Sequence, residues 1–357
     1  MNFSFRRKRV SGILTVVPAN QRSFVEEMKN FNFPEARSLK LMEVMGYNKR
    51  RMVQPGVCIS DLSIFGIQKM VERGWLQLDQ IDALIVVTVS PDHFMPSTAN
   101  IIQGRLGLDP DVYCLEINQA CAGFVVGLVQ AFSLLDQENV RKVVLINADV
   151  VSRKASPQDR NIYPLIGDAA AITLVERDTE DSFIHATVKN DGSRAEALMI
   201  PAGGLRMPCT PETAKLEDVG DNNLRAMEHL RMDGTAIFNF VQTEVPPLID
   251  GLLKRFEVSK EDVDYFLCHQ PNRFMLQKLA DKMKIPYAKM PNNVVENFGN
   301  SGGATIPTSI TFNLGEQFKA GRYLCCLTGF GGGLSWASML MRLGPMSFCE
   351  IIDFPST

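Results

Sequence analysis

The first half of the chain contains short apolar runs that alternate with segments of helical pattern. The helical segments are residues 97–107 and 124–138. The apolar runs have the length and composition of buried strands, and they are residues 83–89, 112–117, 142–148 and 170–176. Strands that alternate with helices in this way are typical of α/β proteins whose strands are mainly parallel.

The chain opens with a basic segment, residues 1–10, which is followed by the apolar run "GILTVV" at 12–17. Signal peptides share this order, but the apolar run is short for one and Pro18 ends it. We therefore expect a first strand here. No apolar run approaches the roughly 18 residues that a membrane-spanning helix needs, so we expect no membrane association.

The second half of the chain repeats features of the first half at a constant spacing. "SPDHFM" at 90–95 corresponds to "QPNRFM" at 270–275, and "RKVVLINAD" at 141–149 corresponds to "GRYLCCLTG" at 321–329. The same offset of 180 residues brings the segment around Cys121 onto "NFGNSGGATIPTSITFNL". Each match alone is weak because β-α units resemble one another, but the common order and offset indicate a duplicated unit.

These matches predict two similar halves, residues 1–177 and 178–357. A polar stretch at roughly 177–230, with Gly, Pro and charged residues, lies between the matching segments. Such a stretch is a linker, a lid or a long surface loop.

Charge and cysteine content exclude several classes of function. The 357 residues carry a net charge of −3 with acids and bases well mixed, so no basic stripe indicates nucleic-acid binding. None of the eight cysteines forms a C-x-x-C pair. Cys114, Cys268, Cys325 and Cys326 lie in apolar runs, where a reduced thiol acts as a small hydrophobe, and this favours a reducing cytoplasm. The four histidines do not cluster with cysteines, so we expect no metal site.

Cys121 lies between a predicted strand and a predicted helix, with Ala120, Ala122 and Gly123 beside it. The positive end of the helix dipole favours the thiolate form of a cysteine in this place. Small neighbours also let a substrate approach the sulfur. A buried cysteine that fills a tight contact between helix and strand explains the same pattern, so the local sequence leaves both interpretations open.

Three other segments carry residues suited to chemistry. His269 follows an apolar strand, and functional sites in parallel α/β sheets gather at the carboxyl ends of strands, although a lone histidine there is more often structural. Asn300 lies in a glycine-rich turn before a helix, where most asparagines are only turn residues. Gly331 and Gly332 belong to a glycine run that permits close approach of the main chain to a ligand. This run lacks the spacing of a dinucleotide-binding fingerprint.

The duplication places Cys121 and the turn of Asn300 at equivalent positions of the two halves. The same symmetry brings the end of strand 83–89 beside the end of the strand that precedes His269. A thiol, an imidazole and an amide would then face one cleft, as a nucleophile with groups able to polarise a carbonyl.

With these motifs in place, the sequence resembles the β-ketoacyl-acyl-carrier-protein synthase III family of the thiolase superfamily. "NQACAGF" is similar to the family's nucleophile motif and implies that Cys121 is acylated. "HQPN" and "GNSGGATIP" are similar to H-Q-A-N and G-N-T-S-A-A-S-I-P, which implies that His269 and Asn300 are catalytic. "FGGGLSWAS" is similar to F-G-G-G-F-T-W-G-S and implies an oxyanion hole formed by the N–H groups of Cys121 and Gly332.

The resemblance also implies a thiolase-like fold of αβαβα layers, a homodimer and substrate contacts. It implies that Met95, after Phe94, crosses the dimer to the partner's acyl pocket, and that Asn272 lies near the pantetheine. Arg160, in "PQDRN", matches the residue that helps to bind CoA, and Gly331 is expected beside the substrate.

One departure concerns the acyl donor. Family members that take CoA often carry a Trp that packs on adenine, whereas the corresponding segment here, "KLMEVMGYNKRR" at 40–51, has no Trp. We therefore expect the donor to be an acyl carrier protein, or a CoA bound weakly at its adenine end.

The predicted reaction is a decarboxylative Claisen condensation without a cofactor. An acyl thioester loads Cys121, and a malonyl thioester then gives a β-ketoacyl thioester. His269 and Asn300 stabilise the enolate that forms as carbon dioxide departs. Two alternatives remain: an acyltransferase that uses an alcohol or amine without decarboxylation, and a non-catalytic partner subunit.

Overall fold

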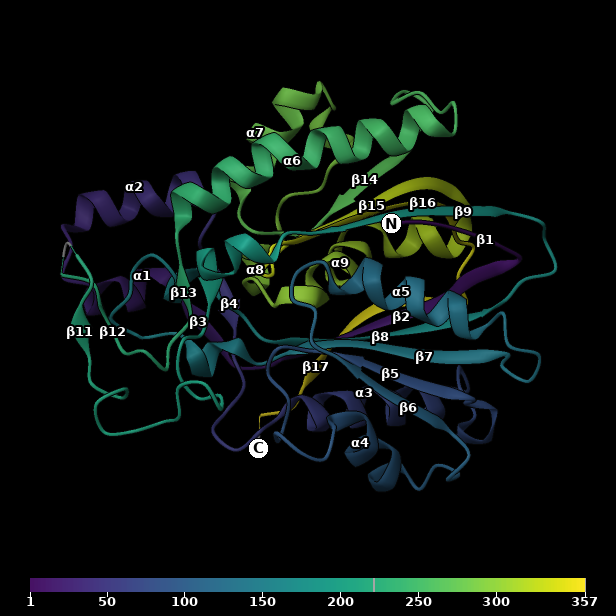
Figure 1. Ribbon diagram of the computed structural model, residues 1–357, viewed down its shortest axis with the longest axis horizontal. Helices are drawn as coiled ribbons and strands as arrows, with labels where there is room; N and C mark the ends of the chain where they lie inside the picture. Colours follow the sequence, from purple (N-terminus) through teal and green to yellow (C-terminus); the bar gives the residue numbers. More distant parts are fainter. Residues whose placement is uncertain (221, 357) are drawn as a thin grey trace.

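The computed structural model describes residues 1–220 and 222–356 and forms two β-sheets with helices between and outside them. Figure 1 shows the resulting five layers, in which helices alternate with sheets. This architecture confirms the predicted α/β class and its layering. Across the described ranges, no helix is long and apolar enough to cross a membrane.

The first sheet contains all four strands predicted from the apolar runs of the first half, and the run at 12–17 lies in its strand β2. Its strands, in spatial order, are β17 (Phe348–Phe354), β2 (Lys8–Pro18), β8 (Ala169–Arg177), β7 (Lys142–Asp149), β5 (Ala83–Val87) and β6 (Tyr113–Ile117). β5 pairs in parallel with β6 and β7, whereas β8 is antiparallel to both β7 and β2.

The second sheet is built mainly from the second half of the chain. Its strands, in spatial order, are β1 (Asn2–Arg6), β9 (Phe183–Asn190), β16 (Ser335–Leu343), β15 (Tyr323–Gly331) and β14 (Tyr265–Cys268). β14 is parallel to β15, and β15 is antiparallel to β16. The glycine run that contains Gly331 and Gly332 begins inside a strand, because β15 extends to Gly331.

Helices cover both faces of each sheet. α5 (Gly123–Leu134) and α9 (Thr305–Ala320) lie between the two sheets, α3 (Ile59–Glu72) and α4 (Thr98–Leu106) cover the first sheet, and α6 (Gly234–Arg255) and α7 (Arg273–Met283) cover the second (Figure 1). Successive strand residues point to opposite faces, so Ile13 packs in the central core while Leu14 packs against α3. Burial on both faces explains why the strands read as continuous apolar runs.

The two halves exchange their end strands. β5, β7 and α5 have counterparts in β14, β15 and α9, as the repeat predicts. However, β1 pairs with β9 in the second sheet, and β17 pairs with β2 in the first. A division at 177/178 falls directly after β8, but it does not separate the two sheets along the chain.

The polar stretch at 177–230 is not simply a connection between the halves. β9 lies inside it and is hydrogen-bonded to β1 on one side and β16 on the other. The chain then leaves the sheet and returns through short elements, which are η5 (Gly192–Ala197), β10 (Leu198–Met199), β11 (Glu217–Asp218), β12 (Leu224–Arg225) and β13 (Arg231–Met232). Because β10 pairs with β13, the start and the end of this excursion lie side by side.

The remaining short elements lie mostly at the end of the molecule where β2, β5 and β7 finish (Figure 1). They are β3 (Gln21–Ser23), α1 (Phe24–Glu27), η1 (Met28–Asn30), α2 (Glu35–Met45), β4 (Lys49–Arg51), η2 (Leu78–Gln80), η3 (Val151–Lys154), η4 (Tyr163–Leu165), η6 (Tyr287–Lys289), α8 (Val294–Phe298) and η7 (Gly302–Ala304).

A buried ion pair holds this end together. Arg50 donates from Nε and Nη2 to the two carboxylate oxygens of Glu27, each at 2.8 Å. Its Nη1 group donates to the carbonyl oxygens of Tyr163 and Ile166, and the guanidinium lies 3.9 Å from the Tyr163 ring centroid. Arg50 therefore ties β4 and α1 to the segment around η4.

Removal of Glu27 should destabilise the fold strongly, because it leaves the Arg50 charge buried without its carboxylate. We predict that Glu27→Ala lowers the free energy of unfolding by about 3–5 kcal/mol, as for other broken buried pairs, in urea denaturation followed by circular dichroism. Glu43→Ala is the matched control, since Glu43 pairs with Lys40 on the exposed surface. Equal effects of the two substitutions would contradict this role of Arg50.

Candidate active site

A cavity of about 470 Å³ opens where the carboxyl ends of β5, β6 and β14 meet. Its wall contains Cys121, His269 and Asn300 together, so both halves of the chain contribute. Most of the remaining wall is apolar and includes Val89, Leu165, Leu198, Ile237 and Met275. The structure thus brings the three predicted residues into one pocket, as the symmetry argument expects.

Close packing explains the small residues around Cys121. A Cβ at Gly123, the first residue of α5, would lie 2.6 Å from Val87 Cγ1, so the helix start rests directly on β5. A Cβ at Gly331 would lie 2.8 Å from the Cys121 sulfur. Gly123 therefore lets α5 pack on β5, and Gly331 lets the main chain of β15 approach the thiol.

The ionisation of Cys121 differs from the expectation of a thiolate favoured by the helix dipole. Burial, the largest cause, and the nearby Asp149 carboxylate raise the pKa of the Cys121 thiol to about 12. The backbone N–H groups of Cys121 and Gly332 act in the opposite direction. The resting residue is therefore a neutral thiol, and the two N–H groups assigned to the oxyanion hole both lie at its sulfur.

Asp149 is a buried carboxylate that the sequence analysis did not identify. It ends β7 and accepts hydrogen bonds from Val89 N–H at 2.8 Å, Thr88 Oγ1 at 3.1 Å and Ser90 Oγ at 3.2 Å. The Gly303 N–H, from the second half, also binds it. Burial nevertheless raises the pKa of Asp149 to about 6. A carboxylate at the end of a largely apolar strand is the one signal of it in the sequence.

His269 is a neutral, buried imidazole at the end of β14. Burial, the main cause, lowers the pKa of His269 to about 3. Its Nδ1 lies 2.7 Å from Thr305 Oγ1, and its ring meets Phe330 edge-on with centroids 5.6 Å apart. A neutral imidazole in this place binds or polarises a ligand by hydrogen bonding.

Asn300 is held by backbone and side-chain bonds. Its N–H donates to the Leu165 carbonyl and its carbonyl accepts from Gly167 N–H, so the first half fixes its main chain. Its Oδ1 accepts from Gly302 N–H at 2.9 Å. Because Oδ1 is engaged, the Nδ2 group is the side-chain donor that faces the pocket.

Of the other predicted site residues, Gly331, Gly332 and Asn272 line the cavity. Asn272 also caps α7, because its Oδ1 accepts from Met275 N–H at 2.8 Å. The pocket therefore receives main-chain groups from the end of β15 and a helix cap from α7.

Phe94, Met95 and Arg160 do not line the cavity of this chain. Phe94 and Met95 are 83% and 85% exposed on the loop after β5. Arg160 is buried, with its guanidinium 4.4 Å from the Phe33 ring centroid and its Nη1 bound to Asn223 Oδ1. The substrate contacts expected of these three residues remain predictions.

The sequence analysis also missed much of the apolar wall, which includes Leu198, Met199, Ile200, Leu230 and Met232. These residues belong to the excursion that β10 and β13 close. They lie in a polar stretch, so their side chains gave no period that would predict a pocket.

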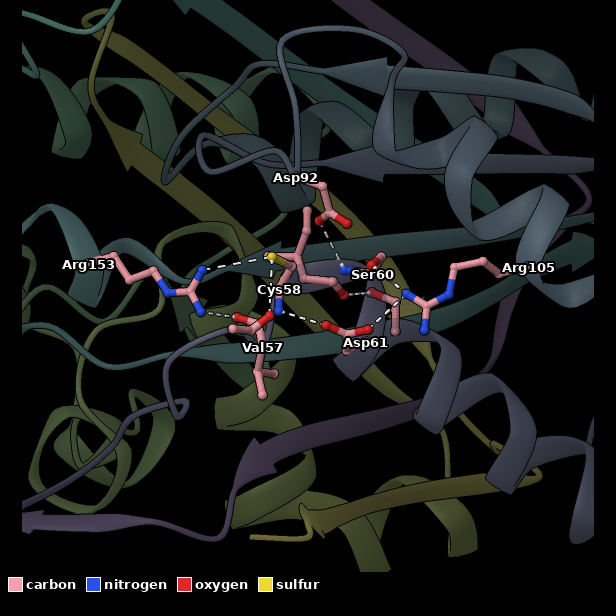
Figure 2. Close-up of polar contacts among 10 residues, drawn as sticks. Val57, Cys58, Ser60, Asp61, Asp92, Arg105 and Arg153 are labelled. Carbon is pink, nitrogen blue, oxygen red and sulfur yellow. Dashed lines mark hydrogen bonds and ion pairs between the residues drawn. The ribbon is translucent and has the colours of Figure 1, made fainter. Parts of the chain in front are cut away.

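Hydrogen bonds at the start of α3 support two segments next to the pocket (Figure 2). Arg153, in η3, donates to the Val57 carbonyl just before α3, and η3 also carries Val151 of the pocket wall. Asp92, on the loop after β5, accepts from the Ser60 N–H of α3 at 3.3 Å. The start of α3 thus anchors both segments.

The family models and the related proteins that match this chain all belong to one enzyme family. Residues 115–192 match the family model 3-Oxoacyl-[acyl-carrier-protein (ACP)] synthase III, and residues 253–343 match the model of its C terminal part. A beta-ketoacyl-[acyl-carrier-protein] synthase III of Streptococcus agalactiae is 33% identical, over 83% of this chain and 88% of its own. The enzyme of the same name from Rhodopirellula baltica is also 33% identical, with the same coverage.

Solved structures agree with this result. The crystal structure of a 3-oxoacyl-(acyl-carrier protein) synthase from Burkholderia xenovorans has a TM-score of 0.91 and 31% identity, and 99% of each chain is covered.

Within the residues that the structure describes, no group of three or more His, Cys, Asp or Glu side chains could hold a metal ion.

Removal of the Asp149 charge should make Cys121 more reactive. Below its pKa the thiolate fraction rises about tenfold for each pH unit, and a pKa lowered by one unit has the same effect at fixed pH. We predict that Asp149→Asn increases the rate of Cys121 alkylation by iodoacetamide at every pH from 7 to about 9, as measured by peptide mass spectrometry. Asp168→Asn, at another buried carboxylate, is the control. An unchanged rate in Asp149→Asn would show that the Asp149 charge does not raise the pKa of Cys121.

Proposed function

Because the chain belongs to the 3-oxoacyl-[acyl-carrier-protein] synthase III family and is an acyl-transferring condensing enzyme, we propose that Cys121, His269 and Asn300 carry the two steps of its reaction. The observation that supports this assignment best is their convergence on one largely apolar cavity. An apolar wall suits an acyl chain, and the few polar groups in it suit a reacting thioester.

In the first step, the Cys121 sulfur attacks the carbonyl carbon of an acyl thioester. The new carbon–sulfur bond forms, the bond to the carrier thiol breaks, and the proton of Cys121 ends on the departing thiol. The N–H groups of Cys121 and Gly332 bind the transient oxyanion, in line with their position at the sulfur.

In the second step, a malonyl thioester occupies the emptied carrier position. Loss of carbon dioxide places negative charge on its thioester oxygen, which accepts hydrogen bonds from Asn300 Nδ2 and from His269. The enolate carbon then attacks the acyl carbon on Cys121, and a carbon–carbon bond forms while the carbon–sulfur bond to Cys121 breaks. The β-ketoacyl thioester leaves, and the Cys121 sulfur takes a proton from water to restore the thiol. Two neutral donors suit this enolate, because neither has to lose a proton.

The acyl donor that fits this chain best is an acyl carrier protein. The Arg160 guanidinium, expected to help bind CoA, is buried against Phe33 and bound to Asn223. This packing leaves its face covered and, with the missing Trp, argues against tight adenine binding. We also propose a homodimer in which a second copy covers the exposed side chains of Phe94 and Met95.

The acylation step predicts a covalent intermediate on one cysteine. Intact-protein mass spectrometry after incubation with acyl-carrier and acyl-CoA thioesters should show one added acyl group per chain, faster from the carrier. Cys121→Ala should abolish this mass increase while its circular dichroism spectrum stays unchanged. Acylation of Cys121→Ala at another cysteine would contradict the assignment of the nucleophile.

The second step predicts that Asn300 serves decarboxylation more than acylation. Asn300→Ala should still form acyl-Cys121 but release carbon dioxide from a malonyl thioester roughly 100- to 1,000-fold more slowly, as when one oxyanion donor is lost. The two rates are measured by mass spectrometry and by release of labelled carbon dioxide. Equal loss of both rates would favour the acyltransferase alternative.

A further inference from the structure

Asp149 lies where two segments of the pocket wall meet, and neither proposed step of the reaction uses it. Its Oδ1 atom accepts hydrogen bonds from the Val89 N–H at 2.8 Å, from Thr88 Oγ1 at 3.1 Å and from Ser90 Oγ at 3.2 Å. These three donors belong to the loop after β5, and Val89 lines the pocket. One carboxylate oxygen therefore serves the first half of the chain.

The other carboxylate oxygen faces the turn that carries Asn300. A Cβ on Gly302 would lie 2.4 Å from Asp149 Oδ2, so this oxygen lies against the turn. The Gly303 N–H binds the carboxylate, and the preceding Gly302 N–H donates to Asn300 Oδ1 at 2.9 Å. Successive N–H groups of one turn thus bind the Asp149 carboxylate and the Asn300 side chain.

A carboxylate suits this place because both of its oxygens accept hydrogen bonds. Backbone N–H groups are fixed donors, and Val89 and Gly303 provide one from each half of the chain. An amide has a single acceptor oxygen, so an asparagine at 149 would point its NH₂ group at one of these N–H groups. Because three donors converge on Oδ1, the amide oxygen would stay there and Gly303 would lose its acceptor.

We propose that Asp149 is a positioning residue that ties the turn of Asn300 to the loop of Val89, and so fixes the direction in which the Asn300 amide points. The kinetic consequence rests on the proposed function, whereas the hydrogen bond from Gly303 does not. This role is separate from the effect of the Asp149 charge on Cys121. Loss of the carboxylate therefore changes the reactivity of Cys121 and the decarboxylation step in opposite directions.

The kinetic test compares these two rates in Asp149→Asn. Carbon dioxide release, when isolated acyl-enzyme meets a malonyl thioester, should be slower by roughly 10- to 100-fold, because a small misplacement of a reacting group has effects of this size. Alkylation of Cys121 by iodoacetamide should be faster than in wild type. General damage to the fold would lower both rates. Carbon dioxide release at or above the wild-type rate would overturn the proposal, because the lost charge and not the lost hydrogen bond would then dominate.

Ser90→Ala is the matched control. It removes one donor to Oδ1 but keeps the carboxylate and the bonds from the Val89 and Gly303 N–H groups. We expect carbon dioxide release close to the wild-type rate in this variant. If Ser90→Ala slows the release as much as Asp149→Asn does, Asp149 acts only in packing and the proposal fails.

The hydrogen bond itself is measured by nuclear magnetic resonance of the full-length protein, with glycine labelled by ¹³C at the carbonyl and by ¹⁵N. Only N–H groups that follow another glycine then give a signal, and these belong to Gly204, Gly303, Gly332 and Gly333. The Gly303 signal is assigned by its loss in Gly303→Ala. Hydrogen bonds to a charged acceptor are shorter and stronger, so we expect this proton signal to lie downfield in wild type and to move upfield in Asp149→Asn.

Wild type alone provides a second measurement of the same bond. Burial raises the pKa of Asp149 to about 6, so the Gly303 signal should also move upfield as the pH falls from about 8 to about 5. Cys121 faces Asp149 from the turn before α5, and His269 reaches the same turn from the end of β14. Their pKa values of about 12 and about 3 lie outside this range. A Gly303 signal that neither pH nor Asp149→Asn moves would overturn the proposal.

The outcomes distinguish this proposal from the proposed function. If wild type releases no carbon dioxide but the Gly303 signal depends on Asp149, the proposed condensation fails and the link between the two segments stands. If the Gly303 signal depends on Asp149 but Asp149→Asn releases carbon dioxide at the wild-type rate, the condensation stands and the positioning role fails.

Discussion

One turn of main chain at Gly302 orders the polar groups of the pocket. Its N–H fixes the side chain of Asn300, and its carbonyl lies at the hydroxyl of Thr305, which meets His269. The turn requires glycine, since φ is +59° and a Cβ would lie 2.4 Å from Asp149 Oδ2. Both groups assigned to enolate binding thus depend on the main chain of this one residue.

Burial determines how this site can work. It raises the pKa of Cys121 and lowers the pKa of His269, so the resting thiol and imidazole are both neutral. A neutral pair avoids the cost of isolated charges in a largely apolar cavity. Negative charge then appears only on substrate oxygens, where preorganised donors stabilise it most in a site of low dielectric constant.

The sequence predicted the features that depend on burial and repetition. The apolar runs predicted five strands of the first sheet, and the matches offset by 180 residues predicted a duplicated unit. The convergence of Cys121, His269 and Asn300 followed from that symmetry. The exchange of β1 and β17 could not be predicted, because strand pairing at a sheet edge is set by tertiary contacts. β9 was missed because polar or exposed residues alternate with its buried Ile184 and Ala186.

The protonation state of Cys121 could not be predicted from the sequence. The helix start beside Cys121 predicts a thiolate, but burial and Asp149 outweigh the dipole. Asp149 acts through contacts between segments far apart in the chain, with donors such as Val89 and Gly303 that only the fold brings together.

The central claim is that acyl transfer from Cys121 forms a carbon–carbon bond and releases carbon dioxide. The most direct measurement is the ratio of carbon dioxide to β-ketoacyl product when isolated acyl-enzyme meets a malonyl thioester labelled in its free carboxyl group. The account predicts a ratio of one, with every acyl group on Cys121 converted to β-ketoacyl product. Loss of the acyl group to an alcohol, an amine or water without carbon dioxide release would contradict it.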